Sequence, residues 1–156
     1  MITCIFEGGE KGQKRHVTTD AILERNGKIL LARRAAHLIE GNKWGLPGGF
    51  LDRDENLEEG LRREILEESG YRVTTVTLFL INSTPNRPKE DRQNVNLTFI
   101  AIPDKKIQDF DQEVARVEWL PFSFLPKEEE FAFDHFMIVS RYIEYRKKKF
   151  DLPVLI

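Results

Sequence analysis

The sequence predicts an α/β protein in which a mixed β-sheet lies between helices, an α/β/α sandwich. Three observations support this fold class: an Asn-Gly turn between two apolar runs, one strongly capped helix in mid-chain, and strand-like runs on both sides of that helix. An amphipathic stretch near the C-terminus supplies a helix for the second face. With a length of 156 residues, we expect residues 1–156 to form one domain.

The first regular elements are two strands joined by a tight turn. Apolar residues lie on both sides of Asn26-Gly27 within the segment 16–34. Asn-Gly between two apolar runs is the strongest short-range signal for a β-hairpin. The Gly-rich segment 7–12, which precedes this hairpin, is expected to be the most flexible part of the chain.

The hairpin is followed by irregular chain and then by the clearest helix. Segment 35–50 is polar in its first half and rich in Pro and Gly in its second half, which excludes a helix there. Asn56 is a good N-cap, and Glu59 three residues later completes a capping box. Gly70 is a natural residue to follow the last helical turn. We therefore expect a helix over 56–69.

The rest of the chain supplies three strands and a long helix. Apolar and β-branched residues predict strands over 73–81, 95–102 and 114–120. A short Phe-rich loop at 121–126 follows, and apolar residues at helical spacing predict a helix over 128–150. The sheet and its two covering helices follow from this order of elements.

The composition excludes several classes of partner. Hydrophobic residues make up 40% and charged residues 32% of the chain, and the net charge is −2. No electrostatic excess favours nucleic acid or an anionic membrane, so neither partner is expected. The single Cys4 excludes an internal disulfide and a multi-cysteine zinc site. Because the chain shows neither a membrane span nor a signal-peptide core, we expect a cytoplasmic protein; a homodimer stays open.

The predicted helix carries its carboxylates on an unusual face. At 100° per residue, its apolar face extends over about 80°, from Leu57 to Ile65. Glu64 and Glu68 fall within about 20° of Leu57, and Glu67 falls about 80° from it. A merely solubilising acidic face would lie opposite the apolar one. The placement therefore indicates carboxylates that point inward or into a cleft.

Clustered carboxylates need a compensating positive charge, because they repel one another. Arg63 is one candidate, since it lies four residues before Glu67 and pairs with it by the helical i,i+4 rule. A divalent cation is the other. An all-oxygen ligand set without His or Cys favours Mg²⁺ or Mn²⁺ over zinc.

Residues 49–71 read GFLDRDENLEEGLRREILEESGY and match the pattern G-x5-E-x7-R-E-U-x-E-E-x-G-U, where U is a bulky apolar residue. This pattern is the Nudix box, so the chain resembles the Nudix hydrolase family. The fixed positions of the box fall on Gly49, Glu55, Arg63, Glu64, Ile65, Glu67, Glu68, Gly70 and Tyr71. Only Tyr71 departs from the pattern, because an aliphatic residue is more usual there.

The resemblance implies the Nudix fold and an enzyme that uses Mg²⁺, with Mn²⁺ as a substitute. The implied reaction is hydrolysis of a nucleoside diphosphate linked to another moiety, by attack of water on phosphorus. The resemblance also implies a metal site made by the box acids and one backbone carbonyl, from Glu64, Glu67, Glu68 and Gly49. It further implies that Arg63 and Glu55 orient these ligands.

The general base has two candidates. In some relatives it is a box glutamate, and in others it is a glutamate on a later loop. Glu113, just before the strand predicted over 114–120, is the best later-loop candidate in this sequence. The alternative for Glu113 is an ordinary exposed loop acid.

The loop at 85–94 is the segment expected to choose the substrate. Arg87 and Arg92 are predicted to bind a second phosphate or a terminal sugar, although polar loops are also common without a function. The Arg-Pro-rich loop resembles ADP-ribose pyrophosphatases, in which a proline lies at a set distance after the box. Pro85 and Pro88 lie near that distance.

Three functions from different classes remain in view. The first is a catalytic Nudix pyrophosphohydrolase. Its favoured substrate is ADP-ribose or a nucleotide sugar, and a nucleoside triphosphate such as an oxidised purine is the alternative. A binding or regulatory module on the same fold would lack the box acids, which this chain keeps. A plain interaction protein with an acidic helix is the third.

Several further residues have a structural interpretation that we favour over a functional one. The aromatic residues Phe79, Phe99 and Phe122 are expected in the core rather than stacked on a base. His135 is expected to be a partly buried, hydrogen-bonded histidine rather than a catalytic one. The basic run 146–149 fits the C-terminal end of a helix better than a nucleic-acid patch.

Overall fold

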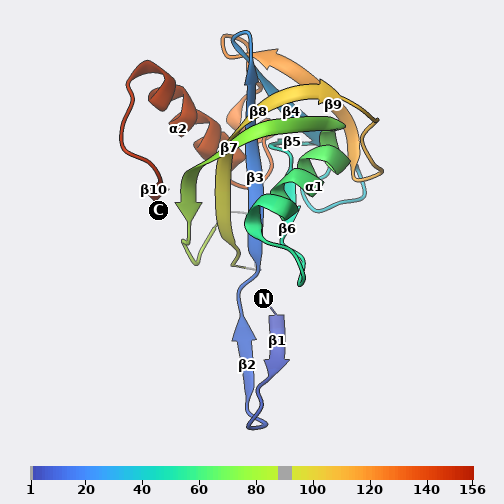
Figure 1. The fold of residues 1–156 in the computed structure, drawn as a ribbon, viewed down its shortest axis with the longest axis vertical. Helices are drawn as coiled ribbons and strands as arrows, with labels where there is room; N and C mark the ends of the chain where they lie inside the picture. The colour runs from blue at the N-terminus through green and yellow to red at the C-terminus, as the bar shows by residue number, and fades with distance from the viewer. Residues whose placement is uncertain (1, 88–92) are drawn as a thin grey trace.

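A computed structural model describes residues 2–87 and 93–156 (Figure 1). Within these residues, one eight-stranded sheet has the order β10-β7-β8-β3-β4-β5, with β6 paired to β3 and β9 paired to β4. The strands are β1 (Ile2–Ile5), β2 (Lys11–Lys14), β3 (Val17–Arg25), β4 (Lys28–Arg34), β5 (Trp44–Gly45), β6 (Gly48–Phe50), β7 (Tyr71–Asn82), β8 (Val95–Lys106), β9 (Val114–Pro121) and β10 (Val154–Leu155).

The sheet is mixed, as the sequence predicts. β3 and β8 are parallel, with Val17 opposite Val95, whereas β7 and β8 are antiparallel. β4 runs antiparallel to both β3 and β9. The β3–β4 turn has positive φ angles of 52° at Asn26 and 71° at Gly27. Two consecutive positive φ angles are what a two-residue hairpin turn requires, so the predicted hairpin is confirmed.

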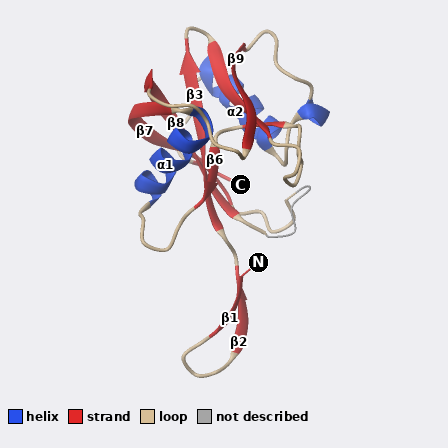
Figure 2. Ribbon diagram, turned by 90° about the vertical axis from the view of Figure 1, so that its right-hand side faces the viewer, coloured by secondary structure: helices blue, strands red, loops and turns tan. Residues whose placement is uncertain are grey.

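Two helices cover opposite faces of the sheet: α1 (Leu57–Ser69) and α2 (His135–Lys147) (Figure 2). Alternating side chains of β3 separate the two cores, because successive residues of a strand point to opposite faces. Ala21 and Leu23 pack in the cluster that contains Leu61 of α1. Ile22 packs in the cluster that contains Val139 of α2. The predicted α/β/α sandwich is confirmed.

The predicted helix 56–69 is confirmed with its caps. The Asn56 side chain accepts hydrogen bonds from the N–H groups of Glu58 and Glu59, and the Glu59 carboxylate accepts one from the Asn56 N–H. Gly70 ends the helix with φ of 76°, in the left-handed region that favours glycine.

The expected helix over 128–150 is wrong in its first turns. The chain forms a short 3-10 helix, η1 (Glu128–Glu130), and α2 begins only at His135. Phe131 instead forms a parallel β-bridge with Trp44, and the Ala132 N–H donates to the Trp44 carbonyl. Phe133 then has φ of 49°, which no right-handed helix contains. A long-range backbone pairing therefore overrides the local helical pattern.

The expected aromatic core is confirmed. Phe79 is fully buried, Phe99 is buried, and Phe122 packs against the cluster on the α2 face. Tyr142 and Tyr145 flank Phe79 with ring centroids 5.7 Å away in each case. Among the described residues, no helix has the length and apolar character needed to cross a membrane.

The N-terminal segment forms a hairpin where the sequence predicted only flexibility. β1 and β2 pair antiparallel in a two-stranded sheet of their own, which projects from the body of the molecule (Figures 1 and 2). The Arg15 side chain holds the base of this hairpin by donating to the carbonyls of Thr84 and Asn94. We call residues 2–14 the N-terminal arm.

Candidate active site

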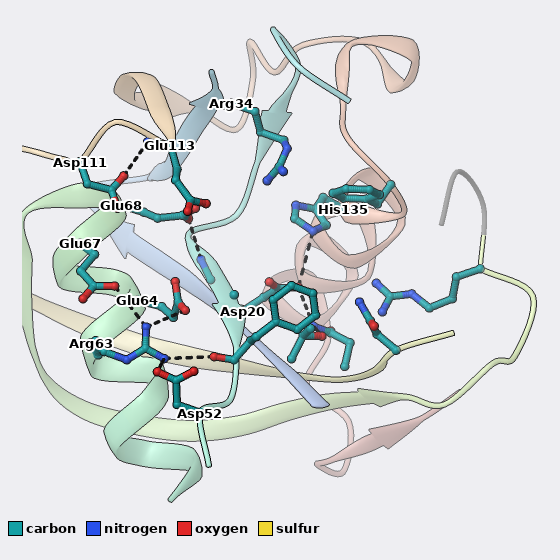
Figure 3. Close-up of a pocket in the computed structure, with 18 residues that line it drawn as sticks. Asp20, Arg34, Asp52, Arg63, Glu64, Glu67, Glu68, Asp111, Glu113 and His135 are labelled. Atoms are coloured by element: carbon teal, nitrogen blue, oxygen red, sulfur yellow. Dashed lines mark hydrogen bonds and ion pairs between the residues drawn. The ribbon is translucent and has the colours of Figure 1, made fainter. Parts of the chain in front are cut away.

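A cavity of about 300 Å³ opens between α1, the β3–β6 pair, and the loops that precede β9 and α2 (Figure 3). Its lining falls into two groups of residues. The acidic end is formed by residues of β6, α1 and the loops after β6 and before β9: Gly48, Gly49, Asp52, Arg63, Glu64, Glu67, Glu68, Asp111 and Glu113. The opposite end, which we call the aromatic–amide end, includes Thr18, Asp20, Arg87, Asn94, Asn96, Phe133 and His135.

Arg63 is the centre of the acidic end. Its guanidinium binds Glu55 through two hydrogen bonds, with Nη2–Oε1 and Nε–Oε2 distances of 2.6 Å and 3.0 Å. Its Nη1 donates to Glu64 at 2.8 Å and to Glu67 at 3.1 Å. Its Nη2 also donates to the Phe50 carbonyl at 3.1 Å. One arginine thus aligns a box glutamate in the loop with two glutamates on the helix.

Glu64, Glu67 and Glu68, the three glutamates in the second half of α1, differ in exposure, and Glu67 differs from the other two as the helical angles predict. The side chain of Glu67 is 44% exposed, whereas that of Glu64 is 14% exposed. Glu68 is 7% exposed, and its carboxylate accepts a hydrogen bond from the Gly48 N–H at 2.9 Å. The glutamate farthest from the apolar face therefore lies at the rim, and the other two point inward.

Burial acts on the pKa values of the two inward glutamates. It raises the pKa of Glu68 to about 8, and the hydrogen bond from the Gly48 N–H only partly opposes this. Burial also raises the pKa of Glu64, although Arg63 acts in the opposite direction. The hydrogen bonds from Arg63 lower the pKa of Glu55. The inward-pointing acids are thus destabilised as anions by their surroundings.

Gly49 lies against the Glu64 carboxylate. A Cβ atom at position 49 would lie 2.5 Å from Glu64 Oε1, which is closer than non-bonded atoms approach. Any side chain at this position would therefore displace the carboxylate. This close approach explains the glycine that the box carries here and leaves the Gly49 backbone beside the acids.

Glu113 lines the acidic end, where Figure 3 shows it above Glu68. Its negative charge contributes to the raised pKa of Glu64, so the two carboxylates repel each other. The backbone fixes this loop, because the Glu113 carbonyl accepts from the Ala35 N–H at 2.8 Å and its N–H donates to the Asp111 carboxylate at 2.9 Å. Asp111 also lines the cavity and was not predicted from the sequence.

Arg87 lines the aromatic–amide end, but Asp134 holds its guanidinium. Arg87 Nε and Nη2 donate to the two oxygens of the Asp134 carboxylate at 2.9 Å and 2.5 Å. Both side chains are at most 5% exposed, and Asn82 donates to the same carboxylate at 2.8 Å. These contacts join the loop after β7 to the start of α2. Arg92 and Pro88, the other residues predicted there, lie outside the described residues.

His135 is buried and hydrogen-bonded, as expected from the sequence. Its Nδ1 accepts a hydrogen bond from the Leu46 N–H at 2.9 Å, which places the ring proton on Nε2. Nε2 lies 3.6 Å from the Asp20 carboxylate, which also accepts from Asn96 at 2.8 Å. Burial raises the pKa of Asp20. His135 also lines the cavity, which the sequence did not indicate, because α2 begins beside the cavity.

Phe133 and Arg34 are cavity residues that sequence reasoning missed. The Arg34 guanidinium carbon lies 5.2 Å from the centroid of the Phe133 ring. No spacing along the chain links these two residues, which come from the end of β4 and the segment before α2. The only local signal, the repeated Phe residues before His135, predicted a helix instead.

The acidic end has the donors that a hard cation requires. The carboxylates of the inward glutamates and the Gly49 carbonyl are all oxygen ligands, which suit Mg²⁺ or Mn²⁺. Among residues 2–87 and 93–156, no three acidic, His or Cys side chains form a ready-made ligand set. Arg63 donates to both Glu64 and Glu67, so an entering cation would compete with one guanidinium.

Comparisons with known proteins agree with this architecture. The NUDIX domain family model matches residues 14–142. An ADP-ribose pyrophosphatase from Methanocaldococcus jannaschii is 31% identical over 130 residues, covering 83% of this chain and 74% of that protein. An 8-oxo-dGTP diphosphatase from Proteus vulgaris is 29% identical over 96 residues, covering 60% of this chain and 80% of that protein.

Solved structures show the same fold. The crystal structure of a NUDIX hydrolase from Nitrosomonas europaea superposes with a TM-score of 0.79 at 27% identity, covering 99% of this chain and 91% of that one. The sandwich with an acid-lined cavity beside its first helix is therefore the architecture of a known class of hydrolases. The chain belongs to the NUDIX domain family and is a Nudix hydrolase.

Proposed function

We propose that this enzyme is a Mg²⁺-dependent pyrophosphohydrolase that cleaves a nucleoside diphosphate linked to another moiety, with ADP-ribose or a nucleotide sugar favoured. One observation carries the proposal: carboxylates held by Arg63 occupy one end of the cavity, and aromatic and amide groups occupy the other. A diphosphate ester has two parts that suit these ends. Its anionic centre would be neutralised by a metal ion that the carboxylates hold, and its uncharged organic group would lie at the other end. The 31% identical ADP-ribose pyrophosphatase supports the same substrate class.

Glu64, Glu67 and Glu68, with the backbone carbonyl of Gly49, would hold the metal. The fit rests on the all-oxygen donor set and on the missing side chain at Gly49, which leaves the space beside Glu64 free of a Cβ atom. When bound, Mg²⁺ supplies charge neutralisation for the diphosphate and increases the acidity of a coordinated water.

Glu113 is our proposed general base. Its carboxylate lies at the acidic end, on a loop that backbone hydrogen bonds to Ala35 and Asp111 hold in place. There it accepts the proton of the attacking water, while Arg63 keeps Glu64 and Glu67 aligned. A box glutamate is the alternative base.

For substrate binding, we keep Arg92 as a proposed contact to a phosphate or terminal sugar. For Arg87 the proposal changes in character, because its Nε and Nη2 already donate to Asp134. A substrate contact from Arg87 must be shared with that carboxylate. Its main contribution is therefore to fix the wall of the cavity.

The direct test is a substrate screen with Mg²⁺ in which products are identified by mass. We expect ADP-ribose to give AMP and ribose 5-phosphate with a higher kcat/KM than any nucleoside triphosphate. A clear preference for a triphosphate, especially an oxidised purine, would reject the diphosphate assignment. It would favour the second candidate, which the 29% identity to an 8-oxo-dGTP diphosphatase supports.

We also propose a homodimer in which a second copy of this chain covers the N-terminal arm. An isolated two-stranded hairpin is marginally stable in water. The arm nevertheless leaves Ile2, Ile5 and Phe6 exposed by 44%, 70% and 42%. Light scattering of the full chain and of Ile5→Glu tests this: we expect a dimer that the substitution weakens, and a monomeric full chain would reject it.

A further inference from the structure

The loop between β8 and β9, residues 107–113, caps the C-terminal end of α1. The Asp111 N–H donates to the Glu67 carbonyl at 2.8 Å, and the Ile107 N–H donates to the Gly70 carbonyl at 2.8 Å. The last carbonyls of a helix have no partner within the helix, so these contacts satisfy groups that would otherwise need water. The loop is therefore attached to the same turn of α1 that carries Glu67, a proposed metal ligand.

Gly70 allows the loop to come close to the helix. A Cβ atom at position 70 would lie 2.0 Å from the Gln108 carbonyl oxygen, which is far closer than non-bonded atoms approach. The Gln108 side chain donates through Nε2 to the Leu66 carbonyl at 3.3 Å. Any side chain at position 70 would push the loop away from these contacts. The box glycine therefore sets the distance between α1 and the loop, besides ending the helix.

Asp111 connects this attachment to Glu113. Its Oδ1 accepts a hydrogen bond from the Glu113 N–H at 2.9 Å, which is the turn that a short carboxylate two residues earlier in the chain can form. The Glu113 carbonyl is held as well, because it accepts from the Ala35 N–H at 2.8 Å. Figure 3 shows the contact between Asp111 and Glu113 above Glu67. Asp111 thus contacts both Glu67, through its backbone, and Glu113, through its side chain.

The position of Glu113 matters because of what a general base requires. A base must lie within hydrogen-bond reach of the proton that it accepts, and a misplacement of about 1 Å can cost about 100-fold in rate. Glu113 is an exposed residue, so the anchors of its backbone decide where its carboxylate lies. One anchor comes from β4 through Ala35, and the other comes from α1 through Asp111.

We propose that Asp111 is a positioning residue for Glu113, which it holds at a fixed place relative to the carboxylates of α1. The inference rests on the proposed role of Glu113 as the general base. The contact requires an acceptor oxygen at Asp111 and does not require its negative charge. Asparagine should therefore replace Asp111 in this role, whereas alanine should not, and a metal ligand would need the charge that asparagine lacks.

The test uses three single variants of the full chain, with Mg²⁺ and the best nucleotide of the substrate screen, which we expect to be ADP-ribose. Asp111→Ala should lower kcat by about 10- to 100-fold and change KM less than about twofold. Asp111→Asn should stay within about threefold of the wild type, because an asparagine makes the same turn. Asp109→Ala is the matched control from the same loop. The Asp109 side chain is 92% exposed and pairs with Lys106, so its loss should change kcat less than about twofold.

Glu113→Gln separates this inference from the proposed base. If Asp111 acts through Glu113, the double variant Asp111→Ala/Glu113→Gln should have a kcat within about twofold of that of Glu113→Gln alone. Losses that multiply, an Asp111→Asn as slow as Asp111→Ala, or an Asp111→Ala with the kcat of the wild type would each overturn the inference alone. A Glu113→Gln with the kcat of the wild type is a different result, which rejects the proposed base and the inference with it.

Amide hydrogen exchange measures the contact without a substrate. We expect Asp111→Ala to speed exchange of the Glu113 amide by about 3- to 10-fold, the range for the loss of one hydrogen bond. Asp111→Asn and Asp109→Ala should leave this rate within about twofold of the wild type. An unchanged Glu113 rate in Asp111→Ala would overturn the inference whatever the kinetics, because Asp111 would then not hold Glu113.

Discussion

The two ends of the cavity both contain an arginine bound to carboxylates, but the two networks differ in form. At the acidic end, Arg63 is shared among Glu55, Glu64 and Glu67, and its side chain is 29% exposed. At the aromatic–amide end, Arg87 forms a two-point pair with Asp134, and both side chains are at most 5% exposed.

This difference determines what each network can do. A shared, partly exposed network tolerates an added cation, since Arg63 keeps Glu55 when it releases another carboxylate. A buried one-to-one pair cannot open without leaving an uncompensated charge in the interior. The acidic end is therefore suited to chemistry, and the Arg87–Asp134 pair is suited to holding shape.

The largest expected effect is at the most buried acid of the acidic end. We expect Glu68→Gln to lower kcat by roughly 10³–10⁵-fold with the fold intact, because it removes a proposed metal ligand. Steady-state kinetics over a range of Mg²⁺ concentrations, with circular dichroism as the fold control, provides the measurement. Wild-type turnover at limiting Mg²⁺ would show that Glu68 binds no metal.

Glu113→Gln tests the acidic end from its opposite wall. We expect kcat to fall by about 10²–10⁴-fold with little change in apparent substrate affinity, as for a lost general base. If the effect is below a few-fold, Glu113 is an ordinary loop acid and a box glutamate is the base.

The comparison predicts a different outcome when the buried pair is broken. Arg87→Met should lower the free energy of unfolding by about 3–5 kcal/mol, because it leaves Asp134 buried without its cation. The double variant Arg87→Met/Asp134→Leu should recover much of this loss. Urea unfolding measures both. If the single variant were as stable as the wild type, the pair would contribute little to the stability of the fold.

The acidic end should also make the metal-free protein sensitive to pH. Glu68 has a folded pKa of about 8 against an ordinary value of 4.5, so between these values the folded state binds more protons than the unfolded state. The contribution of Glu68 to stability is therefore fully present below about pH 4.5 and falls as the pH rises toward 8, by about 2–4 kcal/mol. Thermal melts should show this decline, Glu68→Gln should flatten it, and Mg²⁺ should reduce it at pH 8.

The smallest expected effect is at Arg62, a matched control for Arg63. Arg62 pairs with the exposed Glu58 and donates to the Val73 and Thr74 carbonyls on the other side of the helix. We expect Arg62→Ala to cost about 1 kcal/mol or less and to leave kcat unchanged. Arg63→Ala should lower kcat. Equal kinetics for the two variants would contradict the role given to the Arg63 network.

The sequence by itself determined the elements whose causes are local. The Asn26-Gly27 turn and the Asn56 cap each depend on contacts within a few residues. The 3.6-residue period of one helix also places Glu64 and Glu68 on its inner side, so the box predicted the acidic end before any fold was known.

Only the tertiary structure decided what faces that helix. Glu113 reaches the acidic end through the pairing of β9 with β4. The bridge between Trp44 and Phe131 replaces the first turns of the expected helix and brings Phe133 to the cavity. These pairings join residues that are distant in the chain, and their energies depend on backbone partners that no local pattern specifies. Local periodicity thus fixes which side chains share a face, whereas long-range pairing fixes which faces meet.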